Sequence, residues 1–275
     1  MPDHIPLYEH ILRVACEAAR AAADVIGAAA GTIGSHNVKS KGLHDLVTEV
    51  DEHAERLIIQ IIRKTFPDHD FLAEESADGL MASAASKESL WIIDPIDGTT
   101  NFIHGVPPYA VSIAFRHQGK LVVGVVHDVP HQEVFTAITG YGAELNGEKL
   151  AVSRTPILSE SLITTGFPYR EYGHIDLYLS VLKKFMADAR GIRRPGSASV
   201  DLAWVACGRF DGFYETGLKP WDVAAGIVLV REAGGAISDY SGNPEPSFTA
   251  QVVASNGHIH GDVLRILEPM QGVFD

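Results

Sequence analysis

Residues 91–102, WIIDPIDGTTNF, place two carboxylates, Asp94 and Asp97, on a Gly- and Pro-bearing segment directly after an apolar run. The run predicts a buried strand, and the end of such a strand is where layered α/β proteins usually bind ligands. Two like charges at this position repel each other, and loss of water raises their free energy further. Each aspartate alone could be an ordinary turn residue. The pair requires a compensating cation, a helix cap or a catalytic role.

The composition limits the class of protein. The chain has 275 residues, of which 46% are hydrophobic, enough for one large domain or two joined halves. A formal net charge of −13 argues against general binding to nucleic acid or to an anionic membrane, because both usually require a basic surface. Cys16 and Cys207 are too few for a disulfide framework. Without a signal peptide or an 18-residue apolar run in the sequence, we expect a soluble, cytoplasmic protein.

The hydrophobic pattern alternates between a helical period and a strand period. The expected helices cover 5–29, 49–65, 175–189, 197–207, 221–233 and 260–268. The expected strands cover 110–115, 120–127, 133–139, 161–166, 191–194, 210–215, 236–240 and 251–255, and Asn146-Gly147 is typical of a hairpin turn.

These elements predict an α/β (α+β) layered sandwich of helices and mainly antiparallel or mixed sheets, because each apolar face must pack on another layer. We expect two halves in one compact unit. The N-terminal α+β half, 1–155, carries most candidate metal ligands, and the C-terminal α/β half, 156–275, carries Asp222 and the residues expected to bind substrate.

Other acidic residues could join the pair, although each has a structural alternative. Glu74 and Glu75 follow a short apolar run and could be ordinary surface glutamates. Asp222 lies in the first turn of the predicted 221–233 helix, where it would meet the positive end of the helix dipole. Asp51 has the spacing of a capping box with Thr48. The residues alone leave these alternatives open.

Residues 96–99, Ile-Asp-Gly-Thr, also match the tail of the motif of haloacid dehalogenase-type phosphatases, which use an aspartate nucleophile. That nucleophile would stand two residues before Asp97, where this chain has Pro95. The chemistry excludes this alternative. Gly98 instead lets a ligand approach the backbone, and Thr99 offers a hydroxyl and an N–H suited to a phosphate oxygen.

Together the motifs resemble the inositol monophosphatase family, and most closely its bacterial inositol-1-monophosphatases. The family segment Asp-Pro-Ile/Leu-Asp-Gly-Thr-Thr-Asn-Phe is matched by WIIDPIDGTTNF, and its Trp-Asp helix by KPWDVAAGIVLVREAGG, 219–235. Three further segments follow the family order: DLVTEVD (45–51), AEES (73–76) and GSASVDLAWVACGRFDGFYE (196–215). The resemblance covers roughly residues 5–265 and implies the layered fold of this family.

The resemblance implies a magnesium-dependent phosphomonoesterase with two to three Mg²⁺ ions in its site. Glu74, Asp94 and the Ile96 carbonyl would hold one ion, and Asp94, Asp97 and Asp222 a second. Oxygen ligands suit Mg²⁺, and the sequence has no HExxH zinc motif.

A third, weaker ion would involve Glu74, with Asp51 and Glu75 nearby. Lys39 or Lys41 would lie on a loop that completes the metal site. The sequence does not distinguish between the two lysines.

The implied reaction is in-line attack of a metal-activated water on phosphorus, without a covalent intermediate. Glu74 and Thr99 would orient the water and help to remove its proton, next to the catalytic Asp94. The residues expected to contact substrate are Asp97, Gly98, Thr99, Gly196, Ser197, Ala198, Glu215 and Asp222. Ser197 could also be a helix N-cap, and Glu215 could form a surface ion pair.

The expected substrate is a small phosphorylated polyol, a myo-inositol monophosphate. The metal motifs recognise only phosphate, so fructose 1,6-bisphosphate, histidinol phosphate and 3′-phosphoadenosine 5′-phosphate stay as alternatives. A hypothesis of another class is a regulatory, protein-binding member with secondary catalysis. The resemblance also implies a homodimer and inhibition by lithium. No nucleic-acid or membrane partner is expected.

Overall fold

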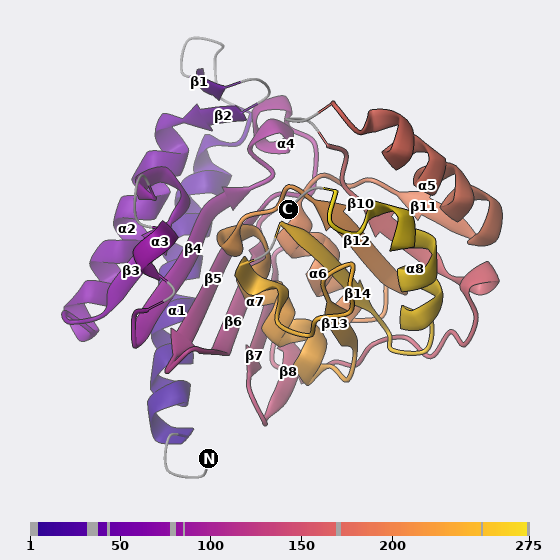
Figure 1. Cartoon of the computed structure of the whole chain (residues 1–275). Helices are drawn as coiled ribbons and strands as arrows, with labels where there is room; N and C mark the ends of the chain where they lie inside the picture. Colours follow the sequence, from indigo (N-terminus) through magenta and orange to yellow (C-terminus); the bar gives the residue numbers. More distant parts are fainter. Residues whose placement is uncertain are drawn as a thin grey trace.

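The computed structural model describes residues 5–31, 38–42, 45–77, 81–84, 86–168, 172–248 and 250–273 (Figure 1). Within them, two sheets alternate with layers of helices, which confirms the layered α/β fold. The predicted helices and strands are present, with ends shifted by at most two residues. No helix in these ranges has the length and apolar character needed to cross a membrane.

The first sheet has seven strands in the order β3-β4-β5-β6-β7-β8-β9. β3 and β4 are parallel, and the other neighbours are antiparallel. The strands are β3 (Asp70–Ala73), β4 (Ser89–Asp97), β5 (Ala110–His117), β6 (Lys120–Asp128), β7 (Glu133–Ile138), β8 (Gly142–Leu145) and β9 (Glu148–Lys149). Asn146 and Gly147 both have positive φ, of 51° and 86°, which confirms the predicted turn between β8 and β9.

Asp94 and Asp97 lie on β4 itself and not on a turn after it, which corrects the expectation from sequence. The register between β4 and β5 shifts between these two aspartates, so the segment is a bulge. Pro95 lies inside the bulge, where its missing N–H breaks no regular ladder bond. The bulge keeps both carboxylates at the same end of a buried strand.

Two long helices cover one face of this sheet. α1 (Ile5–Ala29) and α2 (Glu49–Thr65) direct their apolar faces at alternate residues of the strands, including Trp91, Ile93 and Ile113. A short hairpin, β1 (Val38–Gly42) with β2 (Asp45–Thr48), precedes α2. Lys39 and Lys41 lie on β1, but their side chains are outside the described part of the chain, so the choice between them stays open.

The second sheet has five strands in the order β11-β10-β12-β14-β13. They are β10 (Leu162–Thr165), β11 (Gly191–Arg193), β12 (Gly212–Thr216), β13 (Ala236–Ser238) and β14 (Gln251–Ser255). β10 is parallel to both its neighbours, and β14 is antiparallel to both of its own. α5 (Ile175–Asp188) and α8 (His260–Leu267) pack on the outer face of this sheet.

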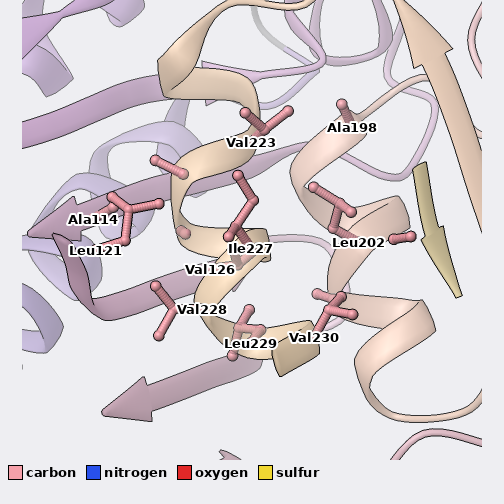
Figure 2. Close-up of a cluster of buried hydrophobic side chains, with 14 of the residues drawn as sticks. Ala114, Leu121, Val126, Ala198, Leu202, Val223, Ile227, Val228, Leu229 and Val230 are labelled. Carbon is pink, nitrogen blue, oxygen red and sulfur yellow. The ribbon is translucent and has the colours of Figure 1, made fainter. Parts of the chain in front are cut away.

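Two helices occupy the layer between the sheets. α6 (Ala198–Ala206) and α7 (Pro220–Glu232) share one apolar core with the inner faces of both sheets (Figure 2). α7 is apolar around most of its circumference, as expected for a helix buried between layers. The residues of this core come from both sides of the expected boundary at 155. The division of the chain into two halves there stays a prediction.

α7 approaches its neighbours closely at two glycines. A Cβ on Gly124 of β6 would lie 2.5 Å from the carbonyl oxygen of Ala225. A Cβ on Gly226 would lie 2.5 Å from two carbon atoms of the Leu202 side chain on α6. Any larger residue at either position would push the layers apart.

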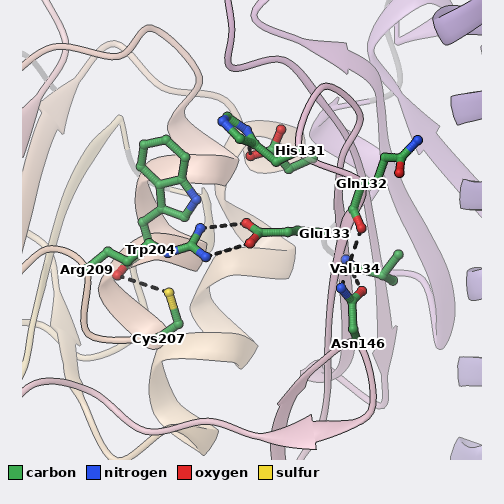
Figure 3. A network of polar contacts seen from close by, with 9 residues as sticks. His131, Gln132, Glu133, Val134, Asn146, Trp204, Cys207 and Arg209 are labelled. Carbon is green, nitrogen blue, oxygen red and sulfur yellow. Dashed lines mark hydrogen bonds and ion pairs between the residues drawn. The ribbon is translucent and has the colours of Figure 1, made fainter.

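A polar contact joins the far end of α6 to the first sheet (Figure 3). The Arg209 guanidinium donates two hydrogen bonds to the Glu133 carboxylate, of 2.5 and 2.6 Å. The guanidinium also lies 5.6 Å from the ring centre of Trp204. Because it is partly exposed, an ion pair of this kind contributes only about 0.2–1 kcal/mol, and it positions α6 more than it stabilises the fold.

Replacement of Gly226 by alanine should lower the free energy of unfolding by roughly 1–3 kcal/mol, because the added methyl overlaps Leu202. Urea denaturation followed by circular dichroism measures this change. Gly27→Ala is the matched control. A Cβ on Gly27, an exposed residue of α1, would meet only Val129 at 3.9 Å, and alanine there should add up to about 1 kcal/mol. Equal effects of the two substitutions would contradict the packing described for α7.

Candidate active site

Four of the predicted carboxylates converge at the end of β4. Asp94 is buried, with 2% of its surface exposed. Burial raises the pKa of the Asp94 carboxyl well above its ordinary value, and the negative charges of Glu74, Asp97 and Asp222 raise it further. Glu74 also forms a side-chain hydrogen bond with Asp94. Residues from three separate segments therefore create one buried concentration of negative charge.

The local fold explains how the outer two acids reach this point. Glu74 begins a 3₁₀ turn, η3 (Glu74–Ser76), directly after β3, the parallel neighbour of β4. Asp222 lies in the first turn of α7, where its Oδ2 accepts the backbone N–H of Lys219 at 2.7 Å. The helix-start interpretation of Asp222 is thus confirmed, and it is compatible with a site role.

The donor set fits Mg²⁺ in chemistry, because the converging ligands are all oxygens and a divalent cation would offset their repulsion. Within the described ranges, however, no three Asp, Glu, His or Cys side chains are arranged as a metal site. Some of the oxygens are held by backbone groups: Asp94 Oδ1, for example, accepts the Ile96 N–H at 3.0 Å. The sharing of ions among these acids stays a prediction.

Asp97 connects β4 to the start of α6. Its Oδ2 accepts hydrogen bonds from Ser197 Oγ at 2.7 Å, from Ser199 N–H at 2.6 Å and from Ser199 Oγ at 2.5 Å. Burial raises the pKa of Asp97, and these donors partly offset the rise because they stabilise the charged form. We call this set of contacts, Asp97 with Ser197 and Ser199, the Asp97 clamp.

The Asp97 clamp shows how the side chain of Ser197 is used, while its predicted contact with substrate stays a prediction. Ser197 occupies the N-cap position of α6, but its side chain makes no capping hydrogen bond to the helix. The hydroxyl donates to Asp97 instead. Ser199 is a site residue that the sequence pattern did not indicate. Its spacing of two residues from Ser197 was the available signal.

The predicted phosphate side lies where β4 ends. Gly98 has a φ of 90° and precedes α4 (Thr99–His104). A Cβ at Gly98 would lie 3.1 Å from the Pro108 carbonyl oxygen, so only glycine meets both the conformation and the space. Thr99 Oγ1 lies 3.2 Å from Asp51 Oδ1 and 3.0 Å from the Ile96 carbonyl oxygen, and it can donate to either. The Ile96 carbonyl, a predicted metal ligand, thus also faces a hydroxyl of this chain.

Asp51 has its predicted capping role, and its place near a third ion stays a prediction. It forms the capping box predicted with Thr48, since Thr48 N–H donates to Asp51 Oδ2 at 2.9 Å. Its other oxygen, Oδ1, faces the Thr99 hydroxyl. Burial raises the pKa of the Asp51 carboxyl, and hydrogen bonds from Thr48 and Thr99 lower it again in part.

The backbone of Glu75 is hydrogen-bonded to α2. Its N–H donates to Glu55 Oε2 at 2.7 Å, and Glu55 is 4% exposed. Glu55 was not indicated from sequence, although it lies four residues after Asp51 on an otherwise apolar helix face, which is an available signal. The Glu55 carboxylate therefore holds the backbone of η3, the turn that carries Glu74, against α2.

Glu215, on the predicted alcohol side of the substrate, is half-buried at the end of β12. A Cβ on Gly166 would lie 1.9 Å from its carboxylate, so the carboxylate packs directly on the Gly166 backbone. This position does not match the alternative of an exposed ion pair. Burial raises the pKa of Glu215 to about 8, against the opposing effect of the Arg194 charge.

Asp201 is a further buried acid that the sequence pattern did not indicate. It lies on α6 with 1% of its surface exposed. Burial raises the pKa of the Asp201 carboxyl well above its ordinary value, and the negative charge of Glu215 adds to the rise. Asp201 and Glu215 therefore form a second pair of neighbouring acids, which we call the second acidic layer.

Replacement of Ser199 by alanine should lower the free energy of unfolding at pH 7 by about 1–3 kcal/mol, because the buried Asp97 carboxylate loses a donor. Denaturation with urea provides the measurement. In the control Ser180→Ala, the lost hydroxyl is exposed and donates to the Leu177 carbonyl, so the change should stay within about 0.5 kcal/mol. A Ser199→Ala variant as stable as this control would show that the clamp contributes little.

This chain is similar in sequence and in fold to several known proteins. Nus factor SuhB of Pseudomonas aeruginosa is 44% identical over 261 residues, which cover 94% of this chain and 96% of that protein. Two solved structures have a similar fold. The extragenic suppressor protein suhB of Bartonella henselae has a TM-score of 0.86 at 38% identity, over 96% of this chain and 99% of the other. Inositol monophosphatase from Anabaena (Nostoc) sp. PCC 7120 has a TM-score of 0.83 at 39% identity, over 95% and 96%.

The family assignment rests on nearly the whole chain. Residues 7–271 match the inositol monophosphatase family, and this range includes both sheets, the layer between them and every predicted site residue. The chain therefore belongs to the inositol monophosphatase family.

Proposed function

We propose that this protein is a Mg²⁺-dependent phosphomonoesterase that hydrolyses myo-inositol monophosphates. The observation that carries the proposal is the convergence of Glu74, Asp97 and Asp222 on the buried Asp94, beside the start of α4. Family membership supports a phosphatase in general, and the choice of an inositol monophosphate comes from the resemblance of 191–222 to the bacterial-type members.

Two to three Mg²⁺ ions would be held by Glu74, Asp94, the Ile96 carbonyl, Asp97 and Asp222. When bound, the ions supply Lewis-acid activation of water and stabilisation of the leaving oxygen. The buried negative charge of this set supports the assignment, because it is offset most directly by a divalent cation.

The residues beside this set would position the water and the phosphate. The Thr99 hydroxyl, 3.2 Å from Asp51 Oδ1, orients the attacking water, and Glu74 or Asp51 accepts its proton. The raised pKa of Asp51 favours proton acceptance. The backbone N–H groups of Gly98 and Thr99 bind the phosphate. Attack is direct, because Pro95 stands where an aspartyl nucleophile would be needed.

The alcohol part of the substrate would lie against Gly196, Ser197, Ala198 and Glu215. With a pKa of about 8, the Glu215 carboxyl is largely protonated at neutral pH, so it can donate a hydrogen bond to a hydroxyl as well as accept one. Both roles suit a polyol, whose hydroxyls donate and accept. Histidinol phosphate, fructose 1,6-bisphosphate and 3′-phosphoadenosine 5′-phosphate are the alternatives to compare.

Substitution of Asp94 by asparagine should abolish Mg²⁺-dependent phosphate release from inositol 1-phosphate while circular dichroism stays that of the folded protein. The physical reason is that the acid at the centre of the cluster loses its charge. Phosphate release from the four esters, with and without Li⁺, gives the measurement, and we expect lithium to inhibit. Asp68→Asn, an exposed control, should keep full turnover. Near-normal turnover by Asp94→Asn would reject the assignment, and faster release from another ester would change the substrate.

A second candidate function is binding to a transcription complex, in addition to catalysis. It is favoured by the name Nus factor of the 44% identical relative from Pseudomonas aeruginosa. With a net charge of −13, we expect such binding to occur through protein contacts more than through direct contact with nucleic acid. We also propose a homodimer, as the family resemblance implies.

Capture of purified transcription complexes by the immobilised protein should be equal for wild type and Asp94→Asn if binding is separate from catalysis. Light scattering after size exclusion reports the oligomeric state in the same samples. The candidate is rejected if neither protein captures the complex above the level of an unrelated acidic protein. Capture by wild type alone would instead link binding to the metal site.

A further inference from the structure

The side chain of Asn101 connects two loops that come from opposite halves of the chain. Its Nδ2 donates one hydrogen bond to the Pro108 carbonyl and one to the Pro195 carbonyl, both at 2.8 Å. Pro108 precedes β5, and Pro195 follows β11. Both amide protons are therefore used, one toward each loop.

The segments that contain Gly98, Asn101 and Gly196 are in close contact around the Asn101 amide. A Cβ on Gly196 would lie 3.1 and 3.2 Å from the Asn101 amide nitrogen and oxygen. A Cβ on Gly98 would lie 3.2 Å from the Gly196 carbonyl oxygen. Both glycines have positive φ, of 98° and 90°. With glycine required at both positions, the distance between the segments is set by backbone contact and by the Asn101 hydrogen bonds.

These segments have different expected tasks. Gly98 and Thr99, which begin α4, would bind the phosphate, and Gly196 to Ala198 would bind the alcohol part of the substrate. Asn101 lies one turn into α4 and holds the residue just before Gly196. The Asp97 clamp is a second polar link between these two segments, and it acts on Ser197 and Ser199, which follow Gly196 in the chain.

We infer that Asn101 is a positioning residue that sets the alcohol-binding segment at its working distance from the phosphate-binding helix. The inference rests on the proposed function. Only a side chain with two N–H donors on one atom can serve two carbonyls in this way, so an aspartate of the same shape would repel both. Loss of the amide should affect substrates in proportion to their contacts on the alcohol side.

The test compares two esters in the Mg²⁺-loaded protein. For Asn101→Ala we expect kcat/KM toward inositol 1-phosphate to fall about 10- to 100-fold, as for a small displacement of a binding segment. Toward 4-nitrophenyl phosphate, which has no polyol hydroxyls, the fall should be less than about threefold, since the lost contacts are on the alcohol side. Asn101→Asp should show at least the same loss of selectivity.

Hydrogen–deuterium exchange of the metal-free protein gives a readout that does not depend on turnover. In Asn101→Ala, the backbone amides of 196–199 should exchange faster, while the amides of the core helix α7 should be unchanged. The matched control is Asn256→Ala. Asn256 Nδ2 also serves two acceptors, Ser153 Oγ and the Thr155 carbonyl, both at 2.9 Å, but it lies in the turn after β14. Loss of the Asn256 amide should leave the ratio of kcat/KM between the two esters unchanged.

The outcomes separate this inference from the proposed function. Suppose that wild type hydrolyses inositol 1-phosphate. If both Asn101 variants then lower kcat/KM equally for the two esters, or leave amide exchange at 196–199 unchanged, Asn101 is not a positioning residue. If Asn256→Ala shifts the ester ratio as strongly, the effect is one of general stability and the inference fails. A wild type without turnover on either ester would reject the proposed function first, and the substrate role of Asn101 with it.

Discussion

The close packing of α7 between β6 and α6 is the constraint on which the rest of the structure depends. Gly124 and Gly226 allow the helix to approach both neighbours at distances that any Cβ would prevent. An apolar surface around most of the helix buries it between the two sheets. Because Asp222 lies in the first turn of this helix, the packing of the core also decides where one of the four converging acids stands relative to Asp94. Core and candidate site are therefore coupled.

α6 is tied to the first sheet at both of its ends. At its start, the Asp97 clamp supplies three hydrogen bonds to a buried carboxylate, and hydrogen bonds to charged groups are worth about 1.5–3 kcal/mol each. At its far end, Arg209 pairs with Glu133 in a partly exposed contact of smaller worth. The stronger tie is the one at the candidate site. Asp97 thus has a structural role in addition to its predicted role as a metal ligand.

Buried negative charge without a cation is destabilising, and this site concentrates it in two layers. Asp94 and its neighbours form the first layer, and Asp201 with Glu215 forms the second. In both layers burial is the main cause of the raised pKa values. A divalent cation would offset the repulsion in the first layer, and protonation would neutralise the charge of the second. Such a concentration of charge is common where function outweighs stability.

Much of this protein could be predicted from sequence, because helical and strand periods report local burial and motifs report chemistry. Four features follow from residues within a few positions of one another. They are the boundaries of the predicted elements, the family, the capping box of Asp51 and the helix-start position of Asp222. The bulge at Asp94 and Asp97 could not be predicted in this way, because a register shift depends on the partner strand. The roles of Ser199 and Asn101 could not be predicted either. Ser199 binds Asp97, 102 positions away, and Asn101 binds Pro195, 94 positions away. Periodicity determines which side chains are buried, but only the packed layers decide which distant groups meet.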